Sequence, residues 1–139
     1  MVRAFFQQGT LMMHVGDRDH LHLVMNDPVY CPILGIQGVL MVAISSVRTG
    51  SYVDAACLLD VGDHPFIQHQ SFVYYRDSNV FNADRLQVGV EAGNLRPRET
   101  LSLEVFRRVR EGFYADPLRH NSKVSRFIRQ RLEPDFKHI

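Results

Sequence analysis

The pattern of apolar and polar positions divides the chain into a first part with strand-like spacing and a second part with helical spacing. Up to about residue 90, short apolar runs alternate with clusters of Gly, Pro, Asp and Asn, which is typical of short strands joined by turns. The run over residues 38–46 is the clearest, and its nearly all-apolar, β-branched composition indicates that both faces are covered. The pattern predicts strands over residues 10–15, 20–26, 38–46, 55–61 and 71–75, in a small antiparallel barrel or sandwich.

After Pro97 the apolar residues recur at helical spacing. Thr100 is a candidate N-cap for a first helix, whose apolar stripe comprises Leu101, Val105, Phe106, Val109 and Phe113. Ser122 is a candidate cap for a second helix, which carries Val124, Phe127, Ile128 and Leu132 on one side. We therefore predict an α+β fold, mainly β, with two C-terminal helices. Residues 1–139 form one domain, with a β half over about residues 10–90 and a basic helical half over about residues 98–133.

The distribution of charge changes this picture more than the net charge of +1 does. Residues 1–95 carry five Arg or Lys against nine Asp or Glu, whereas residues 96–131 carry ten basic residues against four acidic ones. A segregated basic segment is typical of a protein that binds a polyanion. The alternative is that these side chains form the solvated face of the helices.

Several classes of protein are not indicated. No apolar run approaches the roughly 18 residues of a membrane helix, and the N-terminal residues lack the apolar core of a signal peptide, so we expect a cytoplasmic protein without membrane contact. Cys31 and Cys57 are too few and too far apart for a disulfide framework or a cysteine-based zinc site. No phosphate-binding loop, dinucleotide fingerprint or nucleophile elbow is present.

Candidate chemistry comes from histidines and hydroxyls near strand ends. His20 and His22 are two apart in a predicted strand and so point to the same face, while His64 and His69 bracket a proline-containing turn. Ser45 and Ser46 end the buried strand, where side chains emerge at the sheet edge.

Two chemistries fit this set of residues. In metal-free RNA cleavage, one group takes the 2′-hydroxyl proton and another protonates the leaving oxygen, and histidine suits both roles because its ordinary pKa lies near 6.5. In a metal site, His20 and His22 form a His-x-His pair that His64, His69 or Asp63 completes.

Residues 20–86 resemble the MazF/PemK/Kid group of toxin endoribonucleases. The resemblance rests on three segments: His-Leu-His-Leu-Val-Met-Asn-Asp at 20–27, Val-Leu-Met-Val-Ala-Ile-Ser-Ser at 39–46, and a strand from Ser71 that leads to Asp-Arg-Leu at 84–86. It implies an SH3-like barrel that forms a homodimer, cleaves single-stranded RNA without a metal or other cofactor, and is neutralised by an antitoxin, here an acidic protein.

The resemblance assigns the basic catalytic position to His20 and the hydroxyl position to Ser45. In this hypothesis His64 is the partner acid. The substrate-binding residues are Arg48, Arg76, Ser46 and His69. The family has Arg-Pro where this chain has His20-Leu21, so the arginines must supply the phosphate contacts.

Two other functions fit the same residues. The first is a non-catalytic β-barrel module that binds nucleic acid or protein, which the departures from the family pattern favour. The second is a metal-dependent hydrolase that uses the histidine cluster. The basic helices provide a contact for RNA or for an acidic antitoxin in the nuclease hypothesis.

Overall fold

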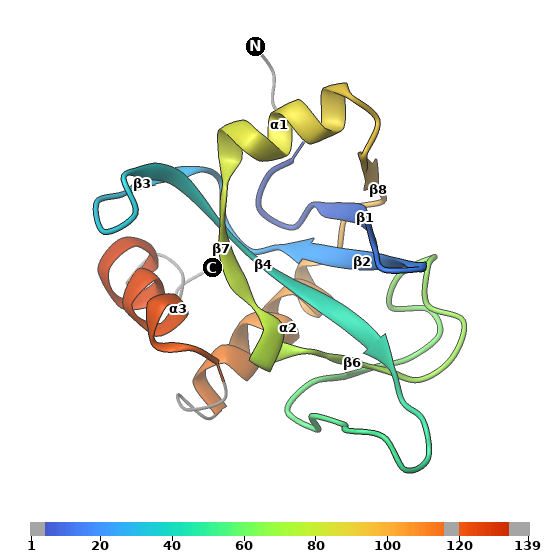
Figure 1. The fold of residues 1–139 in the computed structure, drawn as a ribbon. Helices are drawn as coiled ribbons and strands as arrows, with labels where there is room; N and C mark the ends of the chain where they lie inside the picture. Colours follow the sequence, from blue (N-terminus) through green and yellow to red (C-terminus); the bar gives the residue numbers. More distant parts are fainter. Residues whose placement is uncertain (1–4, 116–119, 134–139) are drawn as a thin grey trace.

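Figure 1 shows the computed structural model of the chain, which describes residues 5–115 and 120–133. The strands are β1 (Thr10–Val15), β2 (Arg18–Val24), β3 (Val29–Cys31), β4 (Ile36–Ser46), β5 (Leu58–Leu59), β6 (Ser71–Val73), β7 (Asn79–Asn82) and β8 (Leu95–Arg98). The helices are α1 (Ala83–Glu91), α2 (Leu103–Ala115) and α3 (Ser122–Phe127), with a 3₁₀ turn at Tyr75–Asp77 and a π-helical turn at Ile128–Leu132.

Strand β4 organises the sheet. It pairs antiparallel with β2 and β3 along one edge and with β6 and β7 along the other, and the full order is β5-β6-β4-β2-β1-β8. Its residues from Gly38 to Val42, and also Ile44, are buried, because both faces of the strand are covered. The Ser46 end of β4 therefore meets β6, and the Ile36 end meets β3.

The predicted fold class is confirmed: the described chain is α+β, mainly β, with two of its helices toward the C-terminus. The eight strands do not close into a barrel, since β5 and β8 end the order and do not pair with each other. Open edges of this kind leave room at the ends of the strands for a surface site.

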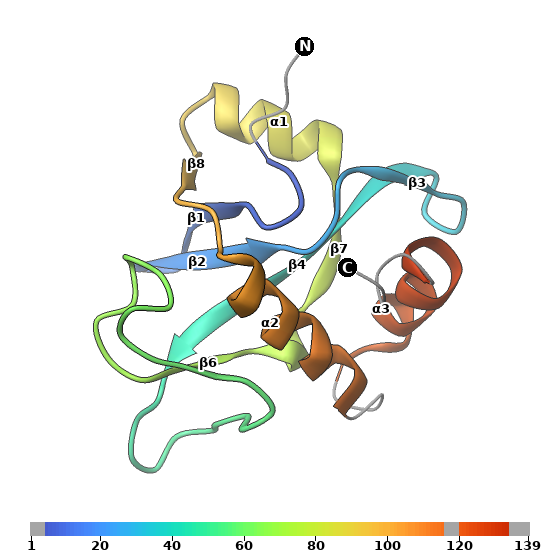
Figure 2. The ribbon, with the colours of Figure 1, turned by 180° about the vertical axis from the view of Figure 1, so that it is seen from behind.

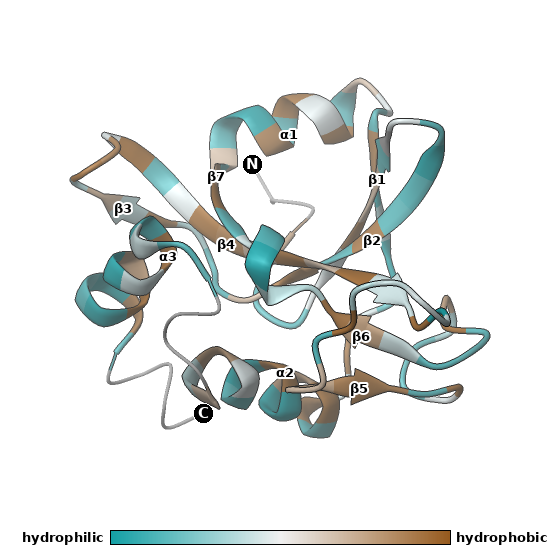
Figure 3. Cartoon of the chain, turned by 60° about the horizontal axis from the view of Figure 1, so that its bottom comes forward, coloured by the Kyte–Doolittle hydropathy of each residue, from teal (hydrophilic) through white to brown (hydrophobic). Residues whose placement is uncertain are grey.

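Two apolar clusters cover the two faces of the sheet. The larger lies under α2 and α3 and includes Phe106, Val109 and Phe127, while the smaller lies under α1 and includes Val39 and Leu86. Figures 1 and 2 show α1 beside the β1 and β8 end and α2 lying across one face of the sheet. Figure 3 shows apolar and polar segments alternating along α2, as expected of a helix that packs on one side only.

A buried hydrogen bond ties the sheet to α2. The Tyr75 hydroxyl donates to the Val109 carbonyl over 2.6 Å, and the Tyr75 ring packs edge-on against Phe113 at 4.8 Å between centroids. Gly112 makes this approach possible, because a Cβ atom at this position would overlap the Tyr75 hydroxyl.

Some element boundaries differ from the sequence predictions. The strand predicted over 55–61 is reduced to Leu58–Leu59, and β3, β7, β8 and α1 were not predicted. The first C-terminal helix is capped by Ser102 rather than Thr100, since the Ser102 hydroxyl accepts from the Val105 amide at 3.2 Å.

The N-cap of the second C-terminal helix lies one residue before the predicted one. Asn121 rather than Ser122 is its N-cap, since the Asn121 side chain accepts from the Val124 amide at 2.9 Å. In both helices the N-cap is a short polar residue within two positions of the predicted one. Its side-chain oxygen accepts a hydrogen bond from a backbone amide of the first turn.

Candidate active site at the Ser46 end of β4

A polar cavity of about 450 Å³ lies where β4 ends and where β2 and β6 begin, beside the loop that follows β4. We call this cavity the basic pocket. Its lining combines cationic, hydroxyl and aromatic side chains, and includes Arg18, His20, Ser45, Arg48, Tyr52 and Tyr74. None of the arginines of α2 or α3 is part of this lining.

Strand register explains how His20 and Ser45 come together. β2 and β4 pair with His22 opposite Ala43, and His20 and Ser45 each lie two residues beyond this pair, on the same faces of their strands. On the other edge of β4, Ser45 is paired with Phe72 of β6. Residues that are directly opposite in a sheet point to the same face, so these three side chains form one row facing the pocket.

The pocket carries more positive than negative charge. Arg18 and Arg48 are exposed at its rim, and Asp19 is the acidic residue in its lining. Asp19 is engaged from outside the pocket: His14 donates to its carboxylate at 3.0 Å and Arg96 at 2.9 Å. The hydrogen bond from His14, with a contribution from Arg96, lowers the pKa of Asp19. The Asp19 carboxylate is thus bonded to two residues that do not line the pocket.

Aromatic rings form the wall opposite the arginines. The rings of Tyr52, Phe72 and Tyr74 are mutual neighbours, with centroids 5.3 to 6.0 Å apart. The guanidinium carbon of Arg76 lies 4.5 Å from the centroid of Tyr52. Arg76 therefore does not line the cavity itself but stacks on a ring that does.

Ser46 and His69, both predicted to bind substrate, contact each other. The Ser46 hydroxyl oxygen lies 2.7 Å from His69 Nε2, and the His69 side chain is exposed. Ser46 lines the basic pocket, so the pair reaches the pocket through the serine.

His64 is not part of the pocket, contrary to its predicted role as the partner acid. The turn that contains it folds its ring inward, where it is 3% exposed. His64 Nε2 donates to the Glu99 carbonyl at 2.7 Å, and the Phe66 amide donates to His64 Nδ1 at 3.0 Å. Both ring nitrogens are occupied by the backbone, which is a structural role.

His22 is also buried, and it packs edge-on against Phe81 with centroids 6.3 Å apart. Burial lowers the pKa of His22, which favours its neutral form. Among residues 5–115 and 120–133 no group of three or more His, Cys, Asp or Glu side chains could hold a metal ion. The ligand set that the metal-dependent hypothesis required is therefore not assembled there.

Three residues that line the pocket were not among the predicted site residues: Arg18, Tyr52 and Tyr74. Arg18 and Tyr74 could have been found from alternation, because they lie two residues from His20 and from Phe72 and share their faces. Tyr52 lies in a loop outside regular secondary structure, and no sequence pattern indicates its position.

The basic helices are partly engaged within the fold. Arg108 of α2 pairs with Asp63 at 2.7 Å, and Arg110 is buried beside Glu111. The exposed charges of the second helical segment are Lys123, Arg126, Arg129 and Arg131. No helix within the described ranges is long and apolar enough to cross a membrane.

Comparison of the chain with protein families, with curated proteins and with solved structures finds no match.

Proposed function

We propose that this protein is an endoribonuclease that cleaves single-stranded RNA in the basic pocket. The observation that carries the proposal is the convergence of His20, Ser45 and Arg48 in one cavity with an aromatic wall. A proton-transfer group, hydroxyls, cations and stacking surfaces are the components that cleavage of a phosphodiester next to a base requires. The same reaction is implied by the resemblance to the MazF group.

In the proposed reaction His20 takes the proton of the 2′-hydroxyl. The 2′-oxygen then attacks the adjacent phosphorus, the bond from phosphorus to the 5′-oxygen breaks, and the products are a 2′,3′-cyclic phosphate and a free 5′-hydroxyl. The leaving 5′-oxygen takes a proton from the Ser46 hydroxyl, which His69 replaces through the 2.7 Å contact. In this reaction His69, and not His64, is the acid that supplies the proton for the leaving oxygen.

Arg18 and Arg48 stabilise the negative charge on the phosphate during this reaction. Both side chains belong to the lining, and two guanidinium groups supply planar donors that match phosphate oxygens. The Ser45 hydroxyl lies beside His20 and holds a non-bridging oxygen by a hydrogen bond.

The Tyr52 and Tyr74 wall contacts the bases. Unpaired bases stack on aromatic rings and on guanidinium planes, whereas paired bases are shielded by their neighbours. The position of Arg76 over Tyr52 extends the stacking surface beyond the cavity. The wall therefore favours single-stranded over double-stranded RNA.

The direct test is cleavage of a 5′-labelled single-stranded RNA in excess EDTA. We expect products with 2′,3′-cyclic phosphate ends, and no cleavage of a DNA strand of the same sequence, which lacks the attacking hydroxyl. His20→Gln, which keeps the size and polarity of the side chain, should abolish cleavage. RNA left intact by the wild-type protein at every pH between 5 and 9 would overturn the proposal.

A non-catalytic RNA-binding module is the second candidate. It is favoured by the presence of one histidine, His20, in the lining of the basic pocket, where acid–base cleavage uses two groups. Salt-dependent binding of RNA without cleavage would support the module and exclude the nuclease.

A further inference from the structure

A second hollow of about 350 Å³ adjoins the basic pocket. We call it the Arg98 hollow. It is lined by Ser46, His69, Ser71 and Arg98, among others, and it shares Ser46, Phe66 and Ser71 with the basic pocket. The shared residues show that the two cavities are neighbours at the end of β4.

Strand register places Ser46 and Ser71 together, between the two cavities. Ser46 is paired with Ser71, one residue along from the Ser45 and Phe72 pair of the basic pocket. Successive residues of a strand point to opposite faces. Ser46 and Ser71 therefore lie one step from the row that contains His20, at the end of the strands, where they line both cavities.

The Arg98 hollow contains groups that bind an anion. The Ser46 hydroxyl and His69 Nε2 are 2.7 Å apart, and the Ser71 hydroxyl donates to the His69 carbonyl at 3.0 Å. The guanidinium carbon of Arg98 lies 6.0 Å from the centroid of Phe66, which also lines the hollow.

Glu99 is the acidic residue beside this cation. Arg98 donates to it through Nε at 2.9 Å. A hydrogen bond from its own backbone amide and that from Arg98 lower the pKa of Glu99, so the carboxylate is charged at neutral pH. The contact uses the inner nitrogen of the guanidinium group, and the two terminal nitrogens are the ones that carry the fork geometry suited to phosphate.

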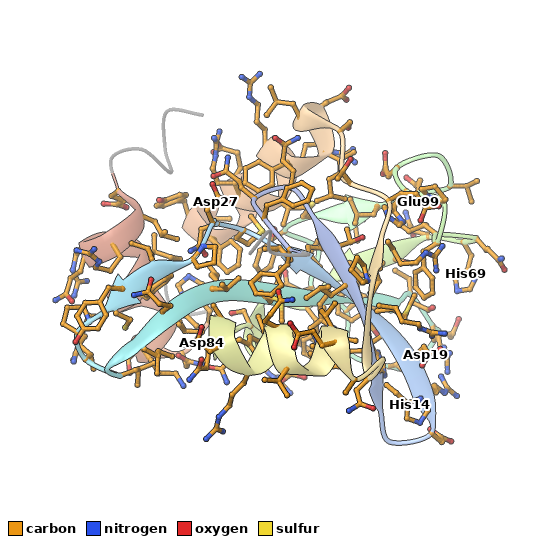
Figure 4. All side chains as sticks on the ribbon, turned by 90° about the horizontal axis from the view of Figure 1, so that it is seen from above. His14, Asp19, Asp27, His69, Asp84 and Glu99 are labelled. Atoms are coloured by element: carbon orange, nitrogen blue, oxygen red, sulfur yellow. The ribbon has the colours of Figure 1, made fainter. Side chains whose placement is uncertain are left out.

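We propose that the Arg98 hollow binds a second phosphodiester group of the substrate, so that the RNA strand bends around the end of β4. This inference rests on the proposed function, which places the scissile phosphate in the basic pocket. The strand then has one phosphate beside Arg48 and a neighbouring one beside Arg98. Figure 4 shows His69 and Glu99 at the same end of the molecule as Asp19, which lines the basic pocket.

The substrate is thus a strand of several nucleotides rather than a dinucleotide. A ligand with a single phosphodiester fills one cavity, whereas a longer strand fills both and gains the second cationic contact. Each phosphate that a protein neutralises on a single strand adds about 0.7 to the slope of log affinity against log salt concentration. Length dependence and salt dependence therefore report on the same contact.

The test compares binding of two 2′-O-methyl RNA ligands, which cannot be cleaved: a dinucleotide with one phosphodiester and a tetranucleotide with three. Arg98→Ala should weaken binding of the tetranucleotide about tenfold, reduce its salt slope by about 0.7, and leave the dinucleotide within about twofold of wild type. Arg98→Lys, which keeps the charge, should restore most of the affinity. Arg85→Ala, an exposed arginine on α1, is the matched control and should change neither ligand.

Arg48→Ala should weaken both ligands, because both place a phosphate in the basic pocket. Equal loss on the two ligands with Arg98→Ala, or no loss on either, overturns the second subsite. Failure of wild type to bind either ligand overturns the subsite and the nuclease together. Arg98-dependent binding of the tetranucleotide without cleavage of RNA retains the subsite and overturns only the nuclease.

Discussion

The basic pocket and the C-terminal helices are both rich in cations, but they present them in different surroundings. In the pocket, Arg18 and Arg48 lie beside serine hydroxyls and a tyrosine wall. On α2, the cation of Arg108 is paired with Asp63 and Arg110 is buried beside Glu111. A segment of the sequence that is dense in arginine and lysine therefore shows where positive charge is, but it does not show where a binding site is. The binding site depends on the hydroxyl, aromatic and acidic groups that surround each cation.

The largest expected difference between the two regions is in catalysis. His20→Ala removes the proposed base from the pocket and should lower the rate of RNA cleavage by about 10²- to 10⁴-fold. Lys123→Ala, on the exposed face of α3, should leave the rate within about twofold of wild type. The readout is the initial rate on a labelled RNA, with thermal unfolding as a control for folding. Equal rates for the two variants would remove the distinction between the regions.

The next largest effect concerns stability and separates the buried from the exposed side of α2. Gly112→Ala introduces a Cβ atom that overlaps the Tyr75 hydroxyl, and should lower the free energy of unfolding by about 3 kcal/mol. Glu104 is an exposed residue of the same helix, so Glu104→Ala should change it by less than about 1 kcal/mol. Urea denaturation followed by circular dichroism measures both. A Gly112→Ala protein as stable as wild type would contradict the close packing between Tyr75 and α2.

A smaller effect distinguishes the arginines of the two regions in RNA binding. Arg48→Ala should weaken binding of a single-stranded RNA about tenfold and reduce the dependence of affinity on salt. Arg126→Ala removes an exposed charge from α3 and should weaken binding by less than about twofold. Fluorescence anisotropy at several salt concentrations provides the measurement. The reverse ranking would place the RNA on the helices and not in the pocket.

The smallest effect tests whether the Arg108–Asp63 pair matters to the fold. The pair spans 2.7 Å but both side chains are partly exposed, so Arg108→Ala should lower the free energy of unfolding by about 0.5 kcal/mol. RNA cleavage should be unchanged. A loss of stability above about 2 kcal/mol would show that the charges of α2 support the fold more than their exposure indicates.

Those parts of the fold that depend on local periodicity could be predicted from the sequence. The β4 strand was recognisable from its unbroken apolar run, and α2 from a helical stripe that includes Val105, Phe106 and Val109. Strands β3, β7 and β8 could not be predicted in the same way, because each has only three or four residues, and β7 and β8 are defined by pairing with strands far away in the sequence. Tertiary pairing rather than local preference decides such segments.

The candidate site, like the fold, could be predicted only in part from the sequence. Positions at the ends of strands and the resemblance to the MazF group indicated His20 and Ser45, and both line the basic pocket. His64 was placed in the same group because its turn is rich in polar residues, but sequence spacing does not show whether a ring in a turn faces outward or inward. Two backbone hydrogen bonds hold this ring inside.

The hydrogen bond from Tyr75 to Val109 has a consequence for the order in which the molecule is made. Tyr75 follows directly after β6, a wall of the basic pocket, yet its partner lies 34 residues later in the chain. During synthesis on the ribosome, a nascent chain that has not yet reached α2 has no acceptor for this hydroxyl and no apolar cover for this part of the sheet. The sheet next to the basic pocket therefore gains this buried partner only after α2 has been synthesised, and a chain that ends before α2 lacks it.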